Sequence, residues 1–344
     1  NVIGNNGRKH LVWLDGTEEF LALDQNNSKT KISVSSDGKT WTSYDDVTSG
    51  GASIALSAVS YIGGSYVGAG AGGHLYTSAN LTEWTKMTAE PYLTGSNDFF
   101  RGITLSSDGA YSMFYATKSW DATGNTGAFL FAADTTQADW YTNLQPVNTT
   151  YDDGIGKFTN VYDVKYSART NRFYGVAGAG SSDAFFFEYE ADIDTLYRRN
   201  GATSSLPAST LAVAETEASY VFAGIGKLYS VAKTQMEGDY STLVFTATDL
   251  TASAGSQAIG TGQRIFALAE GKSGVVGTLA QAAPYGILHI DPAGNTFSIL
   301  SQYYTTDIFA GEAEYSILTE RDTYERSLYG NVTIPVTLFT DTES

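Results

Sequence analysis

The chain of 344 residues contains no cysteine, so disulfides, thiolate metal ligands and cysteine nucleophiles are all excluded. Proline is scarce, with 6 residues, and no apolar run approaches the length of a membrane-spanning helix. No long stretch rich in alanine, leucine, glutamate and lysine persists anywhere in the sequence. These absences disfavour helical and disulfide-stapled proteins, and we expect a chain built from strands and turns.

Basic residues are also few. The chain has 20 lysines and arginines against 37 acidic residues, a net charge of -17, and it has no basic block. We therefore expect neither nucleic acid nor an anionic membrane surface as a partner. The first residues, Asn1 to Gly4, lack an initiator methionine and a signal-peptide pattern, so we expect a chain that was processed or cut from a longer polypeptide.

Glycine (36 residues) and tyrosine (23 residues) are abundant, and short alternating segments are separated by turn clusters. The segment over residues 31–42, KISVSSDGKTWT, shows the pattern most clearly. An alternating strand enters a tight turn at Asp37 and Gly38, and the chain returns through Trp41. This segment predicts a hairpin in which turn chemistry and an aromatic anchor are encoded together.

The hairpin pattern recurs along the chain. HLYTSANLTEWT, which ends at Trp84 and Thr85, stands where KISVSSDGKTWT stood, and a third copy reaches Trp140. Short strands in groups of four continue beyond it, which predicts seven units of about 49 residues each. The expected bounds of the units are 8–47, 51–90, 97–146, 157–203, 208–252, 260–302 and 303–341.

A lone four-stranded meander is marginally stable, whereas meanders arranged radially bury their faces against their neighbours. The sequence therefore predicts a single all-β domain, a seven-bladed β-propeller with a four-stranded antiparallel meander in each blade. Six or eight blades stay open because the fifth copy is ambiguous. The alternative all-β fold, a pair of sandwiches, would show strand spacing without a recurring turn and tryptophan.

Residues 35–41, SSDGKTW, resemble the Asp-box repeat (Ser-x-Asp-x-Gly-x-Thr-Trp) of sialidase-like propellers, also called the bacterial neuraminidase repeat. This copy is one residue short between Asp37 and Gly38. A second copy over 77–84 has Ala79 at the aspartate position, and a third over 132–140 keeps Asp134 and the tryptophan. In that family the box is a structural turn, so the resemblance implies a fold and no catalytic residue.

A sialidase resembling this fold would need an arginine triad, a tyrosine with a glutamate partner and an aspartate acid/base. The Arg-Ile-Pro signature of the family is missing from the chain. Arg101 and Arg264 fall at the starts of predicted first strands, which would line the central channel, and together they could hold a carboxylate. The alternative is that both arginines are solvated or paired with nearby carboxylates.

Asp163 and Asp307 fall near equivalent positions of predicted inner strands. Glycosidases use two carboxylates across a pocket, although any acidic propeller places some carboxylates there by chance. The three histidines, His10, His74 and His289, lie in different repeats, so we expect no zinc site. No motif in the sequence predicts a cofactor.

Aromatic residues in or beside predicted connections are candidates for stacking on sugars or for packing against a partner protein. The alternative is that they pack between blades. These candidate binding residues include Trp120, Tyr151, Tyr303 and Tyr304.

Composition and the shortened box look similar to propeller modules on phage tail and fibre proteins and on secreted bacterial proteins. The resemblance implies a non-enzymatic module for receptor recognition or assembly, with a glycan or protein partner and an extracellular, cell-surface or virion location. The alternative is a glycan-cleaving propeller enzyme that uses Asp163 and Asp307.

Overall fold

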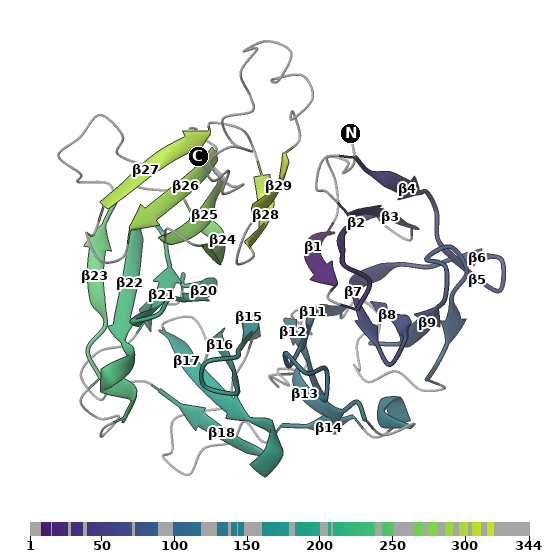
Figure 1. The fold of residues 1–344 in the computed structure, drawn as a ribbon, viewed down its shortest axis with the longest axis horizontal. Helices are drawn as coiled ribbons and strands as arrows, with labels where there is room; N and C mark the ends of the chain where they lie inside the picture. The colour runs from purple at the N-terminus through teal and green to yellow at the C-terminus, as the bar shows by residue number, and fades with distance from the viewer. Residues whose placement is uncertain are drawn as a thin grey trace, which may run out of the picture. The chain divides into compact units, whose positions relative to one another are not determined.

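The computed structural model divides into two compact units, Val2–Arg198 (the N-terminal unit) and Arg199–Ser344 together with Asn1 (the C-terminal unit). Each unit is built almost entirely from antiparallel strands (Figure 1). The residues that the structure describes are 8–14, 16–26, 29–36, 40–70, 73–88, 99–117, 129–136, 139–142, 144–147, 160–178, 183–199, 206–207, 209–237, 243–250, 264–271, 274–280, 286–291, 296–301, 305–310 and 315–319.

The N-terminal unit begins with two four-stranded meanders in which neighbours in sequence are neighbours in the sheet. A short hairpin of two strands, β5 and β6, connects the two sheets along the chain. The strands are β1 (Arg8–Leu14), β2 (Glu19–Asn26), β3 (Lys29–Ser35), β4 (Thr42–Tyr44), β5 (Thr48–Ser49), β6 (Ala52–Ser53), β7 (Leu56–Ile62), β8 (Ser65–Gly70), β9 (Leu75–Ser78) and β10 (Thr85–Lys86).

Two further meanders complete this unit, and a single strand pairing between Thr117 and Asn160 joins them. Their strands are β11 (Phe99–Leu105), β12 (Tyr111–Thr117), β13 (Phe129–Asp134), β14 (Gln145–Pro146), β15 (Asn160–Ser167), β16 (Arg172–Gly178), β17 (Asp183–Glu190) and β18 (Thr195–Arg198), with the 3-10 helices η1 (Trp140–Thr142) and η2 (Ala191–Ile193).

The C-terminal unit contains two four-stranded meanders and a two-stranded sheet among its described residues. Its strands are β19 (Leu206–Pro207), β20 (Ala212–Glu215), β21 (Ser219–Ala223), β22 (Lys227–Ala232), β23 (Thr246–Asp249), β24 (Arg264–Gly271), β25 (Gly274–Ala280), β26 (Gly286–Asp291), β27 (Thr296–Ser301), β28 (Thr305–Ala310) and β29 (Tyr315–Thr319), with the 3-10 helix η3 (Lys233–Glu237).

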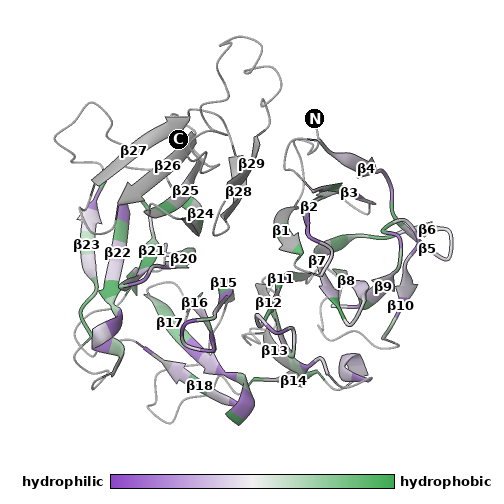
Figure 2. Cartoon of the chain, viewed as in Figure 1, coloured by the Kyte–Doolittle hydropathy of each residue, from purple (hydrophilic) through white to green (hydrophobic). Residues whose placement is uncertain are grey.

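Apolar clusters lie between consecutive sheets of the N-terminal unit. Leu21, Leu23 and Ile32 of the first sheet pack with Leu56 and Trp84 of the second. Further clusters join the second sheet to the third and the third to the fourth. Inner strands such as β7 and β8 therefore bury side chains on both faces, whereas the outer strands β4, β10 and β23 are mostly exposed. Figure 2 shows bands of hydrophilic and hydrophobic residues along β22 in the C-terminal unit. Burial on both faces explains why the strands are rich in apolar and aromatic residues.

The first strands of consecutive sheets lie next to one another. In the N-terminal unit β1 contacts β7, β7 contacts β11 and β11 contacts β15, and in the C-terminal unit β20 contacts β24 and β24 contacts β28. Two buried or half-buried hydroxyls join these neighbours. Ser57 Oγ donates to the carbonyl oxygen of Phe100 over 2.6 Å, and Thr104 Oγ1 donates to that of Val164 over 2.8 Å.

The second copy of the repeated turn is a compact polar turn. Asn80 Oδ1 accepts the backbone N–H groups of Thr82 (3.1 Å) and Glu83 (3.0 Å), and the indole of Trp84 donates to the carbonyl oxygen of Leu81 over 3.0 Å. The interpretation that places Ala79 at the aspartate position is therefore wrong, because the accepting side chain is the next one, Asn80.

The third copy differs from the prediction. We expect a strand over 139–143, but Trp140–Thr142 forms the 3-10 helix η1. The backbone N–H of Thr142 donates to the carbonyl oxygen of Asp139 over 2.9 Å, and the Thr142 hydroxyl donates to the same oxygen over 2.8 Å. Trp140 keeps its anchoring role, since it is only 8% exposed.

Candidate functional site

The first strands carry a repeated irregularity near their starts. In β7, β11, β15, β24 and β28 the pairing with the next strand shifts by one residue at this point, which is a β-bulge. The extra residues are Ser57 in β7, Arg101 in β11, Tyr162 in β15 and Thr306 in β28, and in β24 Phe266 and Ala267 face the single residue Thr278.

The bulges of the N-terminal unit are aligned across neighbouring strands. The bond from Ser57 to Phe100 places the bulge of β7 beside that of β11, because Phe100 directly precedes Arg101. The bond from Thr104 to Val164 sets β11 against β15 in a matching register. Since a bulge re-aims the side chains around it, the starts of these strands present a row of chemically different residues. We call Ser57, Arg101, Tyr162 and Asp163 the bulge row.

Two of the sequence-predicted site residues belong to this row. Arg101 is the bulged residue of β11 and is exposed, whereas Asp163 directly follows the bulge of β15. The Asp163 carboxylate is 18% exposed and lies 3.8 Å from the Nζ of Lys165 on the same strand. The hydroxyl of Ser57 is buried and points into the fold, so Arg101 is the exposed charge of the row.

The other predicted residues lie elsewhere. Asp307 follows the bulge of β28 as Asp163 follows that of β15, and Arg264 is the first residue of β24. Both belong to the C-terminal unit, so the expected pairing of Arg264 with Arg101 and of Asp307 with Asp163 stays a prediction. Four candidates lie outside the described residues, namely Trp120, Tyr151, Tyr303 and Tyr304.

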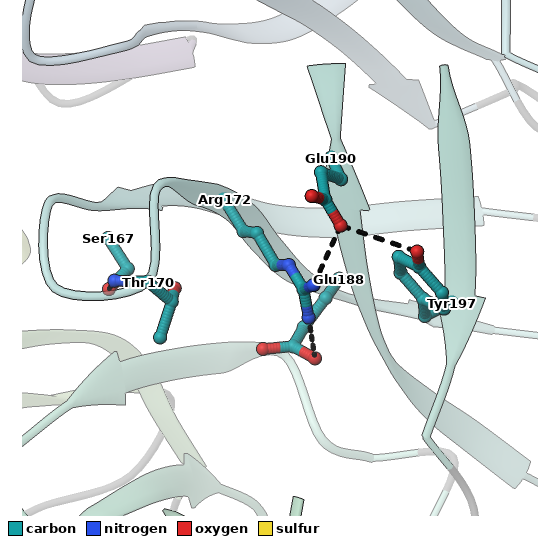
Figure 3. Close-up of polar contacts among 6 residues, drawn as sticks. All are labelled: Ser167, Thr170, Arg172, Glu188, Glu190 and Tyr197. Atoms are coloured by element: carbon teal, nitrogen blue, oxygen red, sulfur yellow. Dashed lines mark hydrogen bonds and ion pairs between the residues drawn. The ribbon is translucent and has the colours of Figure 1, made fainter. Parts of the chain in front are cut away.

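A polar cluster that the sequence analysis missed lies on β16, β17 and β18 (Figure 3). Arg172 Nη2 donates to Glu190 Oε2 over 2.7 Å, and its Nη1 lies 3.7 Å from Glu188 Oε2. The guanidinium carbon also lies 4.9 Å from the centroid of the Tyr197 ring, whose hydroxyl donates to Glu190 over 3.3 Å. Glu188 is almost fully buried, with a side chain 3% exposed.

The arrangement of this cluster follows from strand geometry. Glu188 and Glu190 are two residues apart on β17, so they share one face, and Glu188 is directly opposite Tyr197 on β18. A guanidinium between two carboxylates and above an aromatic ring has its positive charge compensated. Because Arg172 directly follows the β15–β16 turn, the cluster links this turn to β17 and β18. Within the turn, the N–H of Thr170 donates to Ser167 Oγ over 3.2 Å. The sequence signal was FFFEYE, an apolar strand interrupted by two acids at alternate positions.

A second ion pair of this kind stands in the C-terminal unit. Lys233 Nζ lies 2.5 Å from Glu215 Oε1 and 5.4 Å from the centroid of the Tyr220 ring. The Glu215 side chain is 6% exposed, and Glu215 is directly opposite Tyr220 in the sheet. A buried carboxylate that is paired in this way serves the fold, because removal of its partner would leave a charge without compensation.

Within the described ranges, no group of three or more histidine, cysteine, aspartate or glutamate residues is placed to hold a metal ion. The same part of the chain contains no helix that is long and apolar enough to cross a membrane.

Comparison with known proteins identifies the fold. No protein-family model matches the chain, and no curated protein matches it. Among solved structures, YCF48 from Cyanidioschyzon merolae is similar, with a TM-score of 0.59 and 12% identity over 92% of this chain and 94% of that one. The WD40 β-propeller domain of Doa1 is similar with a TM-score of 0.54 and 9% identity, over 92% of this chain and 91% of that one.

A third similar structure is the extracellular domain of the putative one-component system BT4673 from B. thetaiotaomicron. It has a TM-score of 0.59 and 11% identity, and the match covers 93% of this chain and 38% of that one. Together with the four-stranded antiparallel meanders, these likenesses show that the chain is an all-β protein with a β-propeller fold. At such low identity they show the fold alone.

Proposed function

We propose that the chain is a non-enzymatic recognition or assembly module that binds a glycan or protein partner through the starts of its first strands. The observation that carries the proposal is the β-bulge that recurs there in β7, β11, β15, β24 and β28. Bulges are over-represented at rims and beside functional sites, where they re-aim side chains. The recurrence of this irregularity in five first strands supports a role for the surface that it shapes.

The residues at the bulges differ in chemistry from one sheet to the next. Ser57, Arg101, Tyr162 and Thr306 occupy the extra position in four of the first strands. In the N-terminal unit an exposed guanidinium stands with a half-buried tyrosine and a half-buried aspartate, a combination that suits recognition of a polar, asymmetric ligand. In this proposal Arg101, with Arg264, contributes cationic contacts, and the loop aromatics Trp120, Tyr151, Tyr303 and Tyr304 contribute stacking surfaces.

The proposed setting is a sialidase-like propeller of a phage tail, a fibre or a secreted bacterial protein, at a cell surface or on a virion. The turn over residues 78–84 supports this setting, because it belongs to the second copy of the Asp-box-like motif and is a polar turn closed by a side-chain acceptor. The extracellular domain among the similar structures agrees with an extracellular location.

The alternative function is cleavage of a glycan by Asp163 and Asp307. One observation favours it: both aspartates directly follow the bulge of a first strand. We rank it second, because the Asp163 carboxylate already lies beside Lys165 and the arginine signature of the resembling family is absent from the chain.

The test is binding to immobilised glycans and to candidate partner proteins by the wild-type chain and the Arg101→Ala variant. Arg101 is exposed, so this variant should keep the thermal stability of the wild type. We expect Arg101→Ala to weaken retention by about tenfold, as for a lost charge-assisted contact. An exposed serine outside the bulge row, Ser36, provides the control Ser36→Ala, which should bind like the wild type. Retention that is unchanged by Arg101→Ala would place the binding surface elsewhere.

A further inference from the structure

A second exposed surface of the N-terminal unit combines an apolar residue with carboxylates. Ile193 is 55% exposed, the highest value among the exposed large hydrophobic residues that the structure describes. It lies at the end of η2, between β17 and β18, and its neighbours in the chain, Asp192 and Asp194, are both exposed. A single exposed isoleucine is common on protein surfaces, so it indicates a binding surface only together with the residues around it.

The η2 turn lies close to two other connections of the same unit. Tyr166, at the end of β15, donates its hydroxyl to Asn171 Oδ1. The rings of Tyr166, Phe173 and Tyr189 lie in a row, with centroid distances of 5.0 Å and 6.5 Å, and the Tyr189 hydroxyl donates to Asp194, which places the end of η2 at this row. The bond from Thr104 to Val164 sets the end of β11, and with it the turn that carries Asp108, beside the end of β15. Burial raises the pKa of Tyr166, and the negative charges of Asp108 and Asp192 raise it further. We use the name Tyr166 surface for Tyr166, Asp108 and residues 192–194.

Hydrogen bonds hold two of the three carboxylates of the Tyr166 surface in position. Asp108 Oδ1 accepts the Ser106 hydroxyl over 2.5 Å and the N–H of Ala110 over 3.0 Å, and these bonds hold the pKa of Asp108 below its ordinary value. Asp194 Oδ1 accepts the hydroxyl of Tyr189 over 2.7 Å. A partner that binds here would find side chains whose rotamer entropy is already reduced.

These carboxylates have no cationic partner among the described residues, in contrast to two other carboxylates of the unit, Asp45 and Asp46. Asp46 pairs with Lys29, and Asp45 pairs with Lys31. No lysine or arginine within the described part of the chain forms an ion pair with any of the three carboxylates of the Tyr166 surface, Asp108, Asp192 and Asp194. Arg169 on the nearby turn already has an interaction partner.

The surface rests on a rigid base. Tyr166 packs edge-on against Phe173 with ring centroids 5.0 Å apart, and Tyr166 and Ala191 pack against the buried cluster that contains Phe173 and Tyr189. The Tyr166 surface thus combines a supported aromatic ring and an exposed isoleucine with three carboxylates. Interfaces have this composition, with aromatic residues at the centre and polar residues at the edge.

We propose that the Tyr166 surface docks a segment of a partner protein that carries lysine or arginine beside an apolar residue. The proposal rests on the recognition function proposed above and adds a partner of stated chemistry. Charge complementarity selects this occupant, because three unpaired carboxylates repel an anionic glycan and attract cationic side chains. Ile193 would contact the apolar residue of the segment.

The experiment is selection from a random-sequence peptide library on the wild-type chain, followed by fluorescence polarisation with the enriched peptides. We expect the enriched peptides to contain lysine or arginine next to an apolar residue. The triple variant Asp108→Asn, Asp192→Asn, Asp194→Asn should weaken their binding by about tenfold, and the single variant Ile193→Ser should weaken it by about fivefold. Added salt should weaken binding to the wild type but should have much less effect on the triple variant.

The matched control removes three other exposed carboxylates, with the changes Glu18→Gln, Glu83→Gln and Glu217→Gln. It has the same net charge as the triple variant and should bind within about twofold of the wild type. The docking proposal is wrong if no peptide is enriched, if the enriched peptides lack basic residues, or if the control loses as much affinity as the triple variant. A chain that retains a glycan or protein but binds no basic peptide overturns this inference alone and leaves the recognition function standing.

Discussion

At the scale of single residues, the hydroxyls between first strands make the most specific contacts. Ser57 is 3% exposed, and its hydroxyl joins β7 to β11 through the Phe100 carbonyl oxygen. Ser57→Ala leaves this oxygen without its donor, so we expect a loss of about 1–3 kcal/mol in the free energy of unfolding. Urea denaturation measures the loss, and Ser36→Ala, an exposed serine, should cost less than about 0.5 kcal/mol. Equal losses in the two variants would contradict the role of Ser57.

The repeated tryptophans are not equivalent, although the sequence predicts the same anchoring role for each. Trp84 is 2% exposed and donates its indole N–H to Leu81, whereas Trp41 is only half-buried. We expect Trp84→Ala to cost about 3–5 kcal/mol and Trp41→Ala clearly less. Thermal and denaturant unfolding of the two variants checks the difference, and a larger loss for Trp41→Ala would show that the repeats were aligned wrongly.

At the scale of elements, the polar turn over residues 78–84 depends on one side chain. Asn80→Ala removes the acceptor of two backbone N–H groups, so we expect a loss of about 1–2 kcal/mol. Asn80→Asp keeps the accepting oxygen and matches Asp37 of the first repeat, so it should be tolerated. If Asn80→Asp destabilises as much as Asn80→Ala, the amide group has a role that these two bonds do not explain.

The strands were predictable because alternation and turn chemistry are local signals. The sequence predicts strands over 19–23, 172–176 and 184–189, and the structure has them as β2, β16 and β17 with longer bounds. The prediction of a strand over 139–143 is wrong, because the third repeat buries its tryptophan in a 3-10 helix. The β5–β6 hairpin was missed because two-residue strands leave no periodic pattern.

The candidate site was less predictable than the strands. Arg101 and Asp163 were found because they stand at the starts of first strands, which the repeat locates. The bulges at these positions were not predicted, since a bulge depends on pairing with the next strand and leaves no signature in the strand itself. The Arg172 cluster was missed because its members come from three strands that only the folded sheet brings together.

At the scale of the whole molecule, buried tyrosines make stability dependent on alkaline pH. The pKa values of Tyr66, Tyr76, Tyr166, Tyr189 and Tyr229 are all raised above their ordinary value, mainly by burial. The unfolded chain therefore releases phenolic protons at a lower pH than the folded chain, at about pH 10. These tyrosines contribute fully to the free energy of unfolding below about pH 10, and this contribution is lost as the pH rises above that value.

Denaturant unfolding across this pH range measures the effect, and the slope of stability against pH should be shallower in Tyr189→Phe than in the wild type. The comparison uses the slope because Tyr189→Phe also loses the bond to Asp194. A slope that is identical in the two proteins would show that Tyr189 ionises in the folded chain as easily as in the unfolded one.

The proposed propeller binds its partner without chemical change. Mass spectrometry of sialosides and candidate host polysaccharides after incubation with the protein, with bound and free fractions analysed separately, distinguishes binding from cleavage. We expect retained glycan to have an unchanged mass, no product to appear, and Arg101→Ala to abolish most of the retention. Release of a cleaved product by the wild type, together with its loss in folded Asp163→Asn or Asp307→Asn, would contradict the account and establish the enzyme in its place.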